Sequence, residues 1–113
     1  MIEASCHCGA ISFAVEIAPD QVNDCNCSIC RRYGTLWAYY RPAEVRFAAE
    51  NGPTDIYQWG DQTLEFHRCR ICGCVTHWSA VNPARERMGI NARLMAPQVL
   101  AAISVRHGDG ASR

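Results

Sequence analysis

The sequence has no excess charge, no long apolar run and no lysine. Its 11 acidic residues balance 11 basic residues, all of them arginine, so the formal net charge is +0 with neutral histidine. A chain without net charge exerts no general attraction on phosphate or anionic lipid. No apolar run approaches the roughly 20 residues that a membrane-spanning helix needs, and Met1–Cys6 lacks the basic and apolar regions of a secretion signal. These absences predict a cytoplasmic protein without a nucleic-acid or membrane partner.

The length and the apolar content indicate a folded domain of modest size. A chain of 113 residues is enough for one domain, because single domains usually contain roughly 100–150 residues. A hydrophobic fraction of 49% with three tryptophans argues against disorder. We expect one zinc-binding domain over residues 1–107 and a frayed tail over residues 108–113.

The spacing of the 8 cysteines is the most informative feature of the chain. They occur in three clusters: Cys6-His7-Cys8-Gly9, Cys25-Asn26-Cys27-Ser28-Ile29-Cys30 and Cys69-Arg70-Ile71-Cys72-Gly73-Cys74. Disulfides are not expected, since the cytosol keeps thiols reduced. A C-x-C pair in extended chain points both sulfurs to one face, and a C-x-x-C turn followed by glycine aims two thiolates at one ion. The clusters therefore predict metal sites, and soft thiolate ligands favour zinc.

The clusters divide into one complete set of ligands and one incomplete set. The simplest closed, structural zinc site joins the first and third clusters: Cys6, Cys8, Cys69 and Cys72. Three further ligands then remain within six residues: Cys25, Cys27 and Cys30. Three protein ligands with an exchangeable fourth position are typical of a catalytic zinc. Whether Cys74, a histidine or a small molecule completes this second site stays open, as do an iron–sulfur cluster and a redox pair in place of zinc.

Alternating and aromatic segments predict short strands. Apolar and polar residues alternate over Ile11–Ile17, as in a half-buried strand. Asp55–Trp59 and Thr63–His67 flank the turn Gly60-Asp61-Gln62 and predict a hairpin. Further strands are expected at Leu36–Tyr40, Val45–Phe47, Val75–Trp78 and Met88–Ala92.

Helix is predicted only in short pieces. Cys25–Gly34 carries turn residues and is expected to form a turn or short helix ended by its glycine, and Pro97–Ile103 to form a short helix with proline in its first turn. The sequence therefore predicts an all-β fold. Because the cysteine clusters fall where strands meet turns, zinc would hold the ends of the sheets together. Its binding would add stability that a small hydrophobic core does not supply.

The motifs resemble those of the family of glutathione-dependent formaldehyde-activating enzymes, whose domain is shared with centromere protein V. The resemblance runs from about Ser5 to His107 and rests on the three cysteine clusters and on Ile90-Asn91-Ala92-Arg93-Leu94. It implies small β-sheets pinned by zinc, a fold similar to the Mss4-like or β-tent architecture. It also implies two zinc ions per chain, a structural one at Cys6, Cys8, Cys69 and Cys72 and a substrate-facing one at Cys25, Cys27 and Cys30.

The resemblance implies a carbon–sulfur lyase that joins glutathione and formaldehyde into S-hydroxymethylglutathione. Cys25, Cys27 and Cys30 are then the candidate catalytic residues, and the partners are a glutathione-like thiol and an aldehyde. Arg31 and Arg32 are candidates to contact the ligand's carboxylates or to balance thiolate charge.

Two other functions stay open. One is a non-catalytic binding or scaffold domain with two closed four-cysteine sites, the second completed by Cys74. The other, a methionine sulfoxide reductase, would need a reactive cysteine outside the clusters, and the sequence has none.

Overall fold

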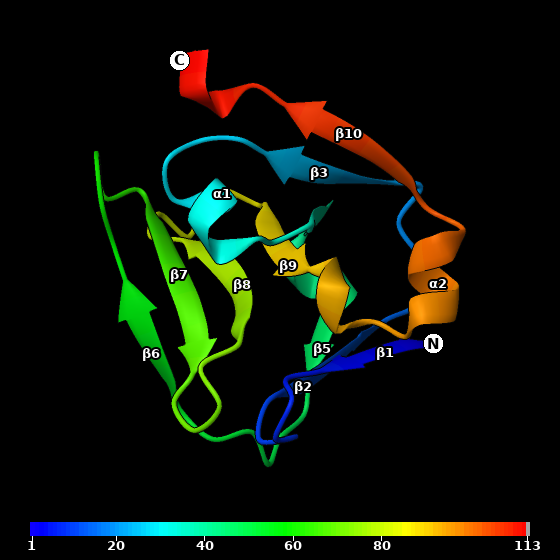
Figure 1. Ribbon diagram of the computed structural model, residues 1–113. Coiled ribbons are helices and arrows are strands. Elements are labelled where there is room, and N and C mark those ends of the chain that lie inside the picture. The colour runs from blue at the N-terminus through cyan, green and yellow to red at the C-terminus, as the bar shows by residue number, and fades with distance from the viewer. Residues whose placement is uncertain (113) are drawn as a thin grey trace.

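The computed structural model describes residues 1–112 and places ten strands in two sheets (Figure 1). The strands are β1 Ile2–Ser5, β2 Ser12–Val15, β3 Gln21–Cys25, β4 Trp37–Tyr40, β5 Val45–Phe47, β6 Thr54–Tyr57, β7 Leu64–Cys69, β8 Val75–Ala80, β9 Met88–Asn91 and β10 Ser104–Gly108. The helices are α1 Cys30–Tyr33 and α2 Pro97–Ala101, with 3-10 turns at Pro42–Glu44, Ala92–Leu94 and Gly110–Ser112. The prediction of an all-β fold with short helices is confirmed. None of the helices described is long and apolar enough to cross a membrane.

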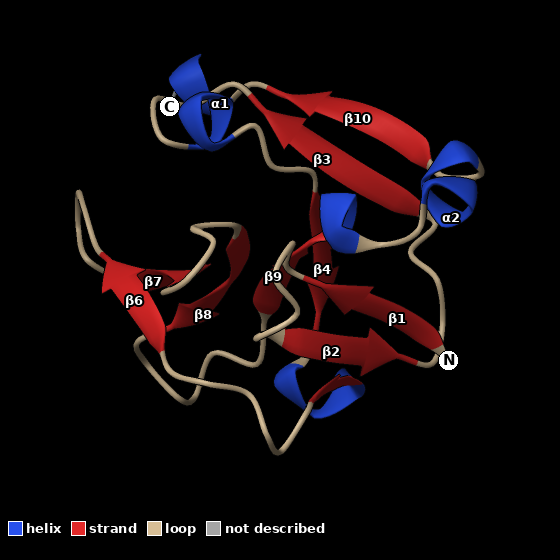
Figure 2. Cartoon of the chain, turned by 60° about the horizontal axis from the view of Figure 1, so that its bottom comes forward, coloured by secondary structure: helices blue, strands red, loops and turns tan. Residues whose placement is uncertain are grey.

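The two sheets differ in size and in connectivity. The smaller sheet has the order β1-β2-β5, and the larger has the order β10-β3-β4-β9-β8-β7-β6. Neighbouring strands are antiparallel except for β10, which runs parallel to β3 and pairs Ser104 with Gln21 and Gly108 with Cys25. The last strand of the chain therefore forms the edge of the larger sheet beside one of the first strands, as Figure 2 shows.

The predicted hairpin and the predicted end of the short helix at Gly34 are both present. β6 and β7 pair antiparallel, with Tyr57 opposite Phe66. α1 ends at Gly34, whose φ of 68° lies in the left-handed region that glycine adopts without strain. Three strands were not predicted, namely β1, β3 and β10. β3 and β10 do not alternate cleanly between apolar and polar side chains, and β1 alternates over only four residues.

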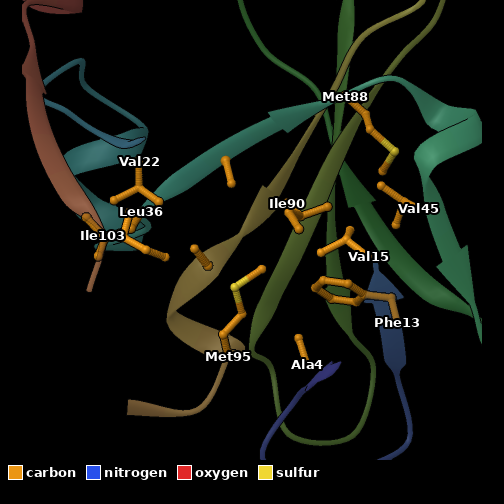
Figure 3. Packing of buried hydrophobic residues seen from close by; sticks show 12 residues of the cluster. Ala4, Phe13, Val15, Val22, Leu36, Val45, Met88, Ile90, Met95 and Ile103 are labelled. Carbon is orange, nitrogen blue, oxygen red and sulfur yellow. The ribbon is translucent and has the colours of Figure 1, made fainter. Parts of the chain in front are cut away.

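The larger sheet has two faces with different roles. One face carries Val22, Ala38 and Ile90, which form the main core together with Phe13 and Val15 of the smaller sheet. In Figure 3 Ile90 lies next to Phe13 and Val15, and Val22 lies beside Leu36 and Ile103. The opposite face carries a second buried cluster of three aromatic rings and two cysteines: Trp37, Phe66, Trp78, Cys25 and Cys30. We call this opposite face the cysteine face.

The chain beyond β10 packs against the loop between β3 and α1. The backbone N–H of Asn26 donates to the Gly108 carbonyl at 3.1 Å, and its side-chain amide donates to Asp109 Oδ1 at 3.0 Å. The Ala111 N–H donates to Asn26 Oδ1 at 2.9 Å. Asn26 thus contacts this segment at three points, and the frayed tail that we expected over residues 108–113 stays a prediction. Position 113 lies outside the described residues.

Candidate metal centres

Four cysteines from two distant segments meet at one end of the molecule. Cys6 and Cys8 follow β1, and Cys69 and Cys72 belong to the end of β7 and the turn after it. Their four sulfurs lie within 4.8 Å of one another. The Cys8 sulfur is 3.7 Å from that of Cys6 and 3.6 Å from that of Cys69. Two sulfurs bound at ~2.3 Å to one tetrahedral zinc lie about 3.8 Å apart, so the donors and their spacing fit this ion.

Two glycines shape the turns that carry these four cysteines. Gly9 and Gly73 have φ values of 83° and 80°, which glycine adopts without the clash a side chain would cause. The Gly73 N–H donates to the Cys69 carbonyl at 3.0 Å and closes the turn. Backbone N–H groups of Cys74 and Cys8 lower the pKa of the Cys72 thiol to about 5. The turn thus favours the thiolate, which is the form that binds metal.

The second group contains three cysteines within one short segment. Cys25 ends β3, Cys30 begins α1 and Cys27 lies between them, and the three sulfurs lie within 4.8 Å of one another. The indole N–H of Trp37 donates to the Cys30 sulfur at 3.3 Å, and the Cys30 N–H donates to the Cys27 sulfur at 3.4 Å. These contacts orient two of the three ligand atoms. In Figure 1 this group, next to α1, lies at the opposite end from the β7–β8 turn that carries Cys72.

The thiols of the second group differ in how readily they ionise. Burial is the largest of the effects that raise the pKa of Cys30 to about 12. Burial is also the largest single effect on Cys27, but hydrogen bonds from the backbone N–H groups of Cys30 and Ile29 and from the neighbouring thiols together outweigh it, and the pKa of Cys27 is lowered. A buried thiolate without a cation is costly. A divalent ion shared by the three sulfurs would supply that cation, and the donor set fits zinc.

Cys74 lies with the first group and not with the second. It packs beside Cys6 and Cys69, and its carbonyl accepts the Cys69 N–H at 2.9 Å. Within residues 1–112, no fourth cysteine, histidine or carboxylate lies within the same 4.8 Å as the three sulfurs of the second group.

The two histidines of β7 and β8 are held away from both groups. His67 shares hydrogen bonds with Thr54 Oγ1 at 2.7 Å and with Ser79 Oγ at 2.8 Å. Its ring stacks on that of His77 at 4.1 Å. Burial, together with His67, lowers the pKa of His77 to about 3. Because His77 pairs with Ile90, it lies on the core face and cannot act as a base at the second group.

Two cavities flank the second group on the cysteine face. One, of about 400 Å³, lies beside the 27–30 loop and is lined chiefly by Arg32, Tyr33, Tyr57, Trp59 and Arg68. The other, of about 590 Å³, is lined chiefly by Asn23, Tyr39, Trp78, Arg85, Arg87 and Arg106.

Sequence analysis identified only some of the residues around these cavities. Of the arginines that it singled out, Arg32 donates to the Ser28 carbonyl at 2.7 Å and Arg31 is exposed. It missed Arg85, Arg87 and Arg106, which come from two separate segments and meet only through strand pairing. No local motif marks them.

The fold and the two groups together define a class of protein. It is a small two-sheet β domain with one four-cysteine group and one three-cysteine group, each of which can hold a metal ion. The sequence pattern of the family described as "Glutathione-dependent formaldehyde-activating enzyme" matches residues 1–104, and the chain belongs to this family. The predicted resemblance is therefore confirmed.

One solved structure is similar over almost the whole chain. It is the crystal structure of a Rhodobacter sphaeroides protein, a Northeast Structural Genomics target. The two sequences are 31% identical, and the alignment covers 93% of this chain and 100% of that chain with a TM-score of 0.73. No curated protein matches the chain.

Proposed function

We propose that the protein is a zinc-dependent carbon–sulfur lyase that joins a glutathione-like thiol to an aldehyde, as in the formation of S-hydroxymethylglutathione from glutathione and formaldehyde. The observation that carries the proposal is the incomplete second group. Cys25, Cys27 and Cys30 offer three ligand atoms, and no fourth side chain of the described residues joins them. A fourth position open to a small molecule is what distinguishes catalytic from structural zinc sites.

The chemistry needs one activated sulfur and one aldehyde held together. Zinc bound by the three cysteines would lower the pKa of a thiol in the fourth position and keep it as thiolate near neutral pH. The sulfur electron pair forms the new carbon–sulfur bond, and the carbonyl electrons move to oxygen, which takes up a proton. The thiol supplies one proton and the product gains one, so no oxidant or reductant is needed.

The protein's own residues contribute positioning. Trp37 fixes the Cys30 sulfur through its indole N–H, and α1, which begins at Cys30 and ends at Gly34, fixes the end of the loop that carries Cys27. The cavities on either side of the group leave room for a thiol and an aldehyde. Holding two reactants in contact removes much of the entropic barrier to their reaction.

The four-cysteine group has the role of a structural zinc site in this proposal. Its ligands are all supplied by the protein and two of them, Cys6 and Cys69, are 2% exposed. The alternative of a scaffold with two closed sites required Cys74 in the second group, and Cys74 packs beside the first. We therefore favour the enzyme over the scaffold.

Cobalt substitution tests the proposed function. We expect glutathione to shift the cobalt–thiolate absorption bands of the fully loaded protein, and S-methylglutathione, whose sulfur is blocked, to leave them unchanged. We also expect the protein to accelerate exchange between formaldehyde and S-hydroxymethylglutathione, measured by NMR at equilibrium, and Cys27→Ser to abolish this acceleration. Cys74→Ser is the matched control and should retain both responses. Unchanged cobalt bands with glutathione, together with no acceleration of exchange, would refute the proposal.

A further inference from the structure

The larger cavity of the cysteine face is bordered by three arginines. Arg106 of β10 pairs with Asn23 of β3, so its side chain points to the same face as Asn23 and Cys25. Arg85 and Arg87 come from the segment before β9 and border the same cavity. We call the cavity bordered by Arg85, Arg87 and Arg106 the arginine pocket.

Two of the three arginines of the pocket lie over aromatic rings. The guanidinium carbon of Arg87 lies 4.2 Å from the centre of the Tyr39 ring, and that of Arg85 lies 5.8 Å from the Trp78 ring. Such stacking orients a guanidinium group and leaves its N–H donors, which lie in its plane, free to bind an anion. The arginine–carboxylate ion pairs within residues 1–112 involve other arginines, namely Arg41, Arg46 and Arg70.

A buried polar atom lies in the wall of the pocket. Asn23 is 7% exposed, and its side-chain amide donates to the Tyr39 hydroxyl at 2.7 Å. Its Oδ1 atom has no hydrogen-bond partner among the described residues. A buried acceptor without a donor is unfavourable, and a ligand or an ordered water that donates a hydrogen bond would satisfy it.

The pocket adjoins the three-cysteine group. Asn23 lies two residues before Cys25 on the same face of the same strand. Asp109 lines the pocket, and the next residue, Gly110, lies against the cysteines: a Cβ atom there would be 2.7 Å from the Cys25 sulfur. The Asp109 carboxylate accepts from Asn26 and from Ser112. One ligand of modest length can thus reach both the pocket and the three sulfurs.

The charges of the two sites are complementary for an anionic thiol. Three thiolates and one zinc ion carry a net charge of −1, which repels an anion at the fourth position. Three arginines and one aspartate give the pocket a net charge of +2, which attracts it. The guanidinium fork matches the geometry of a carboxylate.

We propose that the arginine pocket binds the carboxylate end of the thiol whose sulfur occupies the three-cysteine group, so that the protein selects anionic thiols. This inference rests on the proposed function. The pocket with Arg32 and Arg68 is the competing location, but Arg32 is bound to the Ser28 carbonyl and no more than one other arginine borders that cavity. Arg87 and Arg106 provide the main carboxylate contacts.

Calorimetry of the zinc-loaded protein tests the pocket with S-methylglutathione, which keeps both carboxylates and cannot bind through its sulfur. We expect the double variant Arg87→Gln/Arg106→Gln to bind it at least about tenfold more weakly than the parent, since two charge-assisted contacts are lost. Arg46→Gln, which removes an exposed arginine of the smaller sheet, is the matched control and should bind like the parent. Zinc content and circular dichroism show whether the double variant is folded.

A second ligand separates carboxylate recognition from thiol binding. Glutathione diethyl ester has a free thiol and no free carboxylate, and we expect the double variant and the parent to bind it equally. Equal binding of S-methylglutathione by the double variant and the parent would overturn the inference. A greater loss of binding in Arg68→Gln than in the double variant would do the same, because it would place the carboxylates in the other cavity.

The two proposals can fail separately. If glutathione leaves the cobalt bands unchanged while S-methylglutathione still binds in an arginine-dependent way, the proposed function fails and the pocket remains an anion site. If the bands respond to glutathione and to its diethyl ester with equal affinity, the proposed function stands and the selection of anionic thiols fails.

Discussion

The two cysteine groups differ in how far apart their ligands lie in the chain. The four-cysteine group joins Cys6 and Cys8 to Cys69 and Cys72, so a metal ion there would close a loop of more than half the sequence. The three-cysteine group takes all its ligands from Cys25–Cys30, a segment that is already compact. A metal ion at the first group therefore constrains the fold, whereas an ion at the second mainly constrains one loop. From this difference we expect the first group to contribute stability and the second to exchange ligands.

The sharpest test of this comparison is the loss of one ligand from the four-cysteine group. We expect Cys69→Ser to lose the metal of that group and to unfold the domain. Structural zinc sites contribute about 10–16 kcal/mol in small domains, which is comparable with the ~5–15 kcal/mol total stability of a typical domain. Zinc analysis and thermal unfolding measure the effect. A Cys69→Ser protein with native spectra and full metal content would contradict the assignment.

A glycine on the cysteine face tests how closely that face is packed. A Cβ atom at Gly89 would lie 2.1 Å from Nε1 of Trp78, so Gly89→Ala has to displace the indole. Overpacking of this kind costs about 1–3 kcal/mol, and the Arg85 side chain should lose its contact with the ring. Denaturant unfolding and near-ultraviolet circular dichroism measure both effects. In the control, Gly52→Ala, the added Cβ meets open space, and an equal loss of stability in both variants would refute this explanation.

Loss of a ligand from the three-cysteine group should affect metal content more than stability. We expect Cys27→Ser to lose the metal of that group only and to unfold cooperatively, with a free energy of unfolding within about 1–2 kcal/mol of the parent. Cys27 is only half-buried and its group closes no long loop. Metal analysis with urea unfolding checks this. If Cys27→Ser unfolds as completely as Cys69→Ser, the two groups do not differ in the way described.

The smallest effect is expected for Cys74, which packs beside the four-cysteine group but is not one of its four candidate ligands. Cys74→Ser should keep both metal ions and change the free energy of unfolding by less than about 1 kcal/mol, because Cys74 is only half-buried beside the first group. Cobalt spectra of the loaded variant measure the occupancy of each group. Selective loss of metal from the three-cysteine group would show that Cys74 moves to complete it, and would revive the scaffold alternative.

The sequence predicted the elements that depend on local patterns. The hairpin of β6 and β7 follows from the turn Gly60-Asp61-Gln62, and the end of α1 follows from Gly34. In contrast, β3 carries Asn23 and Asp24 in its interior, and β10 is mostly exposed. Strands of this kind are specified by their partners and not by their own alternation, so the sequence alone could not reveal them.

The candidate sites were predictable where ligand spacing determines them. The C-x-C and C-x-x-C pairs were sufficient to group Cys6 with Cys69, as the structure has them. The position of Cys74 was not predictable. It is the third cysteine of the cluster that begins at Cys69, and the spacing of that cluster does not show which of the two groups Cys74 lies beside. The arginine pocket was also not predictable, because Arg87 and Arg106 become neighbours only through the pairing of β10 with β3 and of β9 with β4.

The pairing of β10 with β3 sets an order of assembly during synthesis. Chains are made from the N-terminus, so all ligands of the four-cysteine group exist once Cys72 has been added. A metal ion at this group can then join two distant segments of the incomplete chain while the edge strand of the larger sheet is still missing. The edge of β3 stays uncovered until Ser104–Gly108 has been made, and the Gly110–Ser112 turn is made after that. The site proposed for chemistry is thus the last part of the molecule to be completed, and the four-cysteine group can take up a metal ion before that site has its final form.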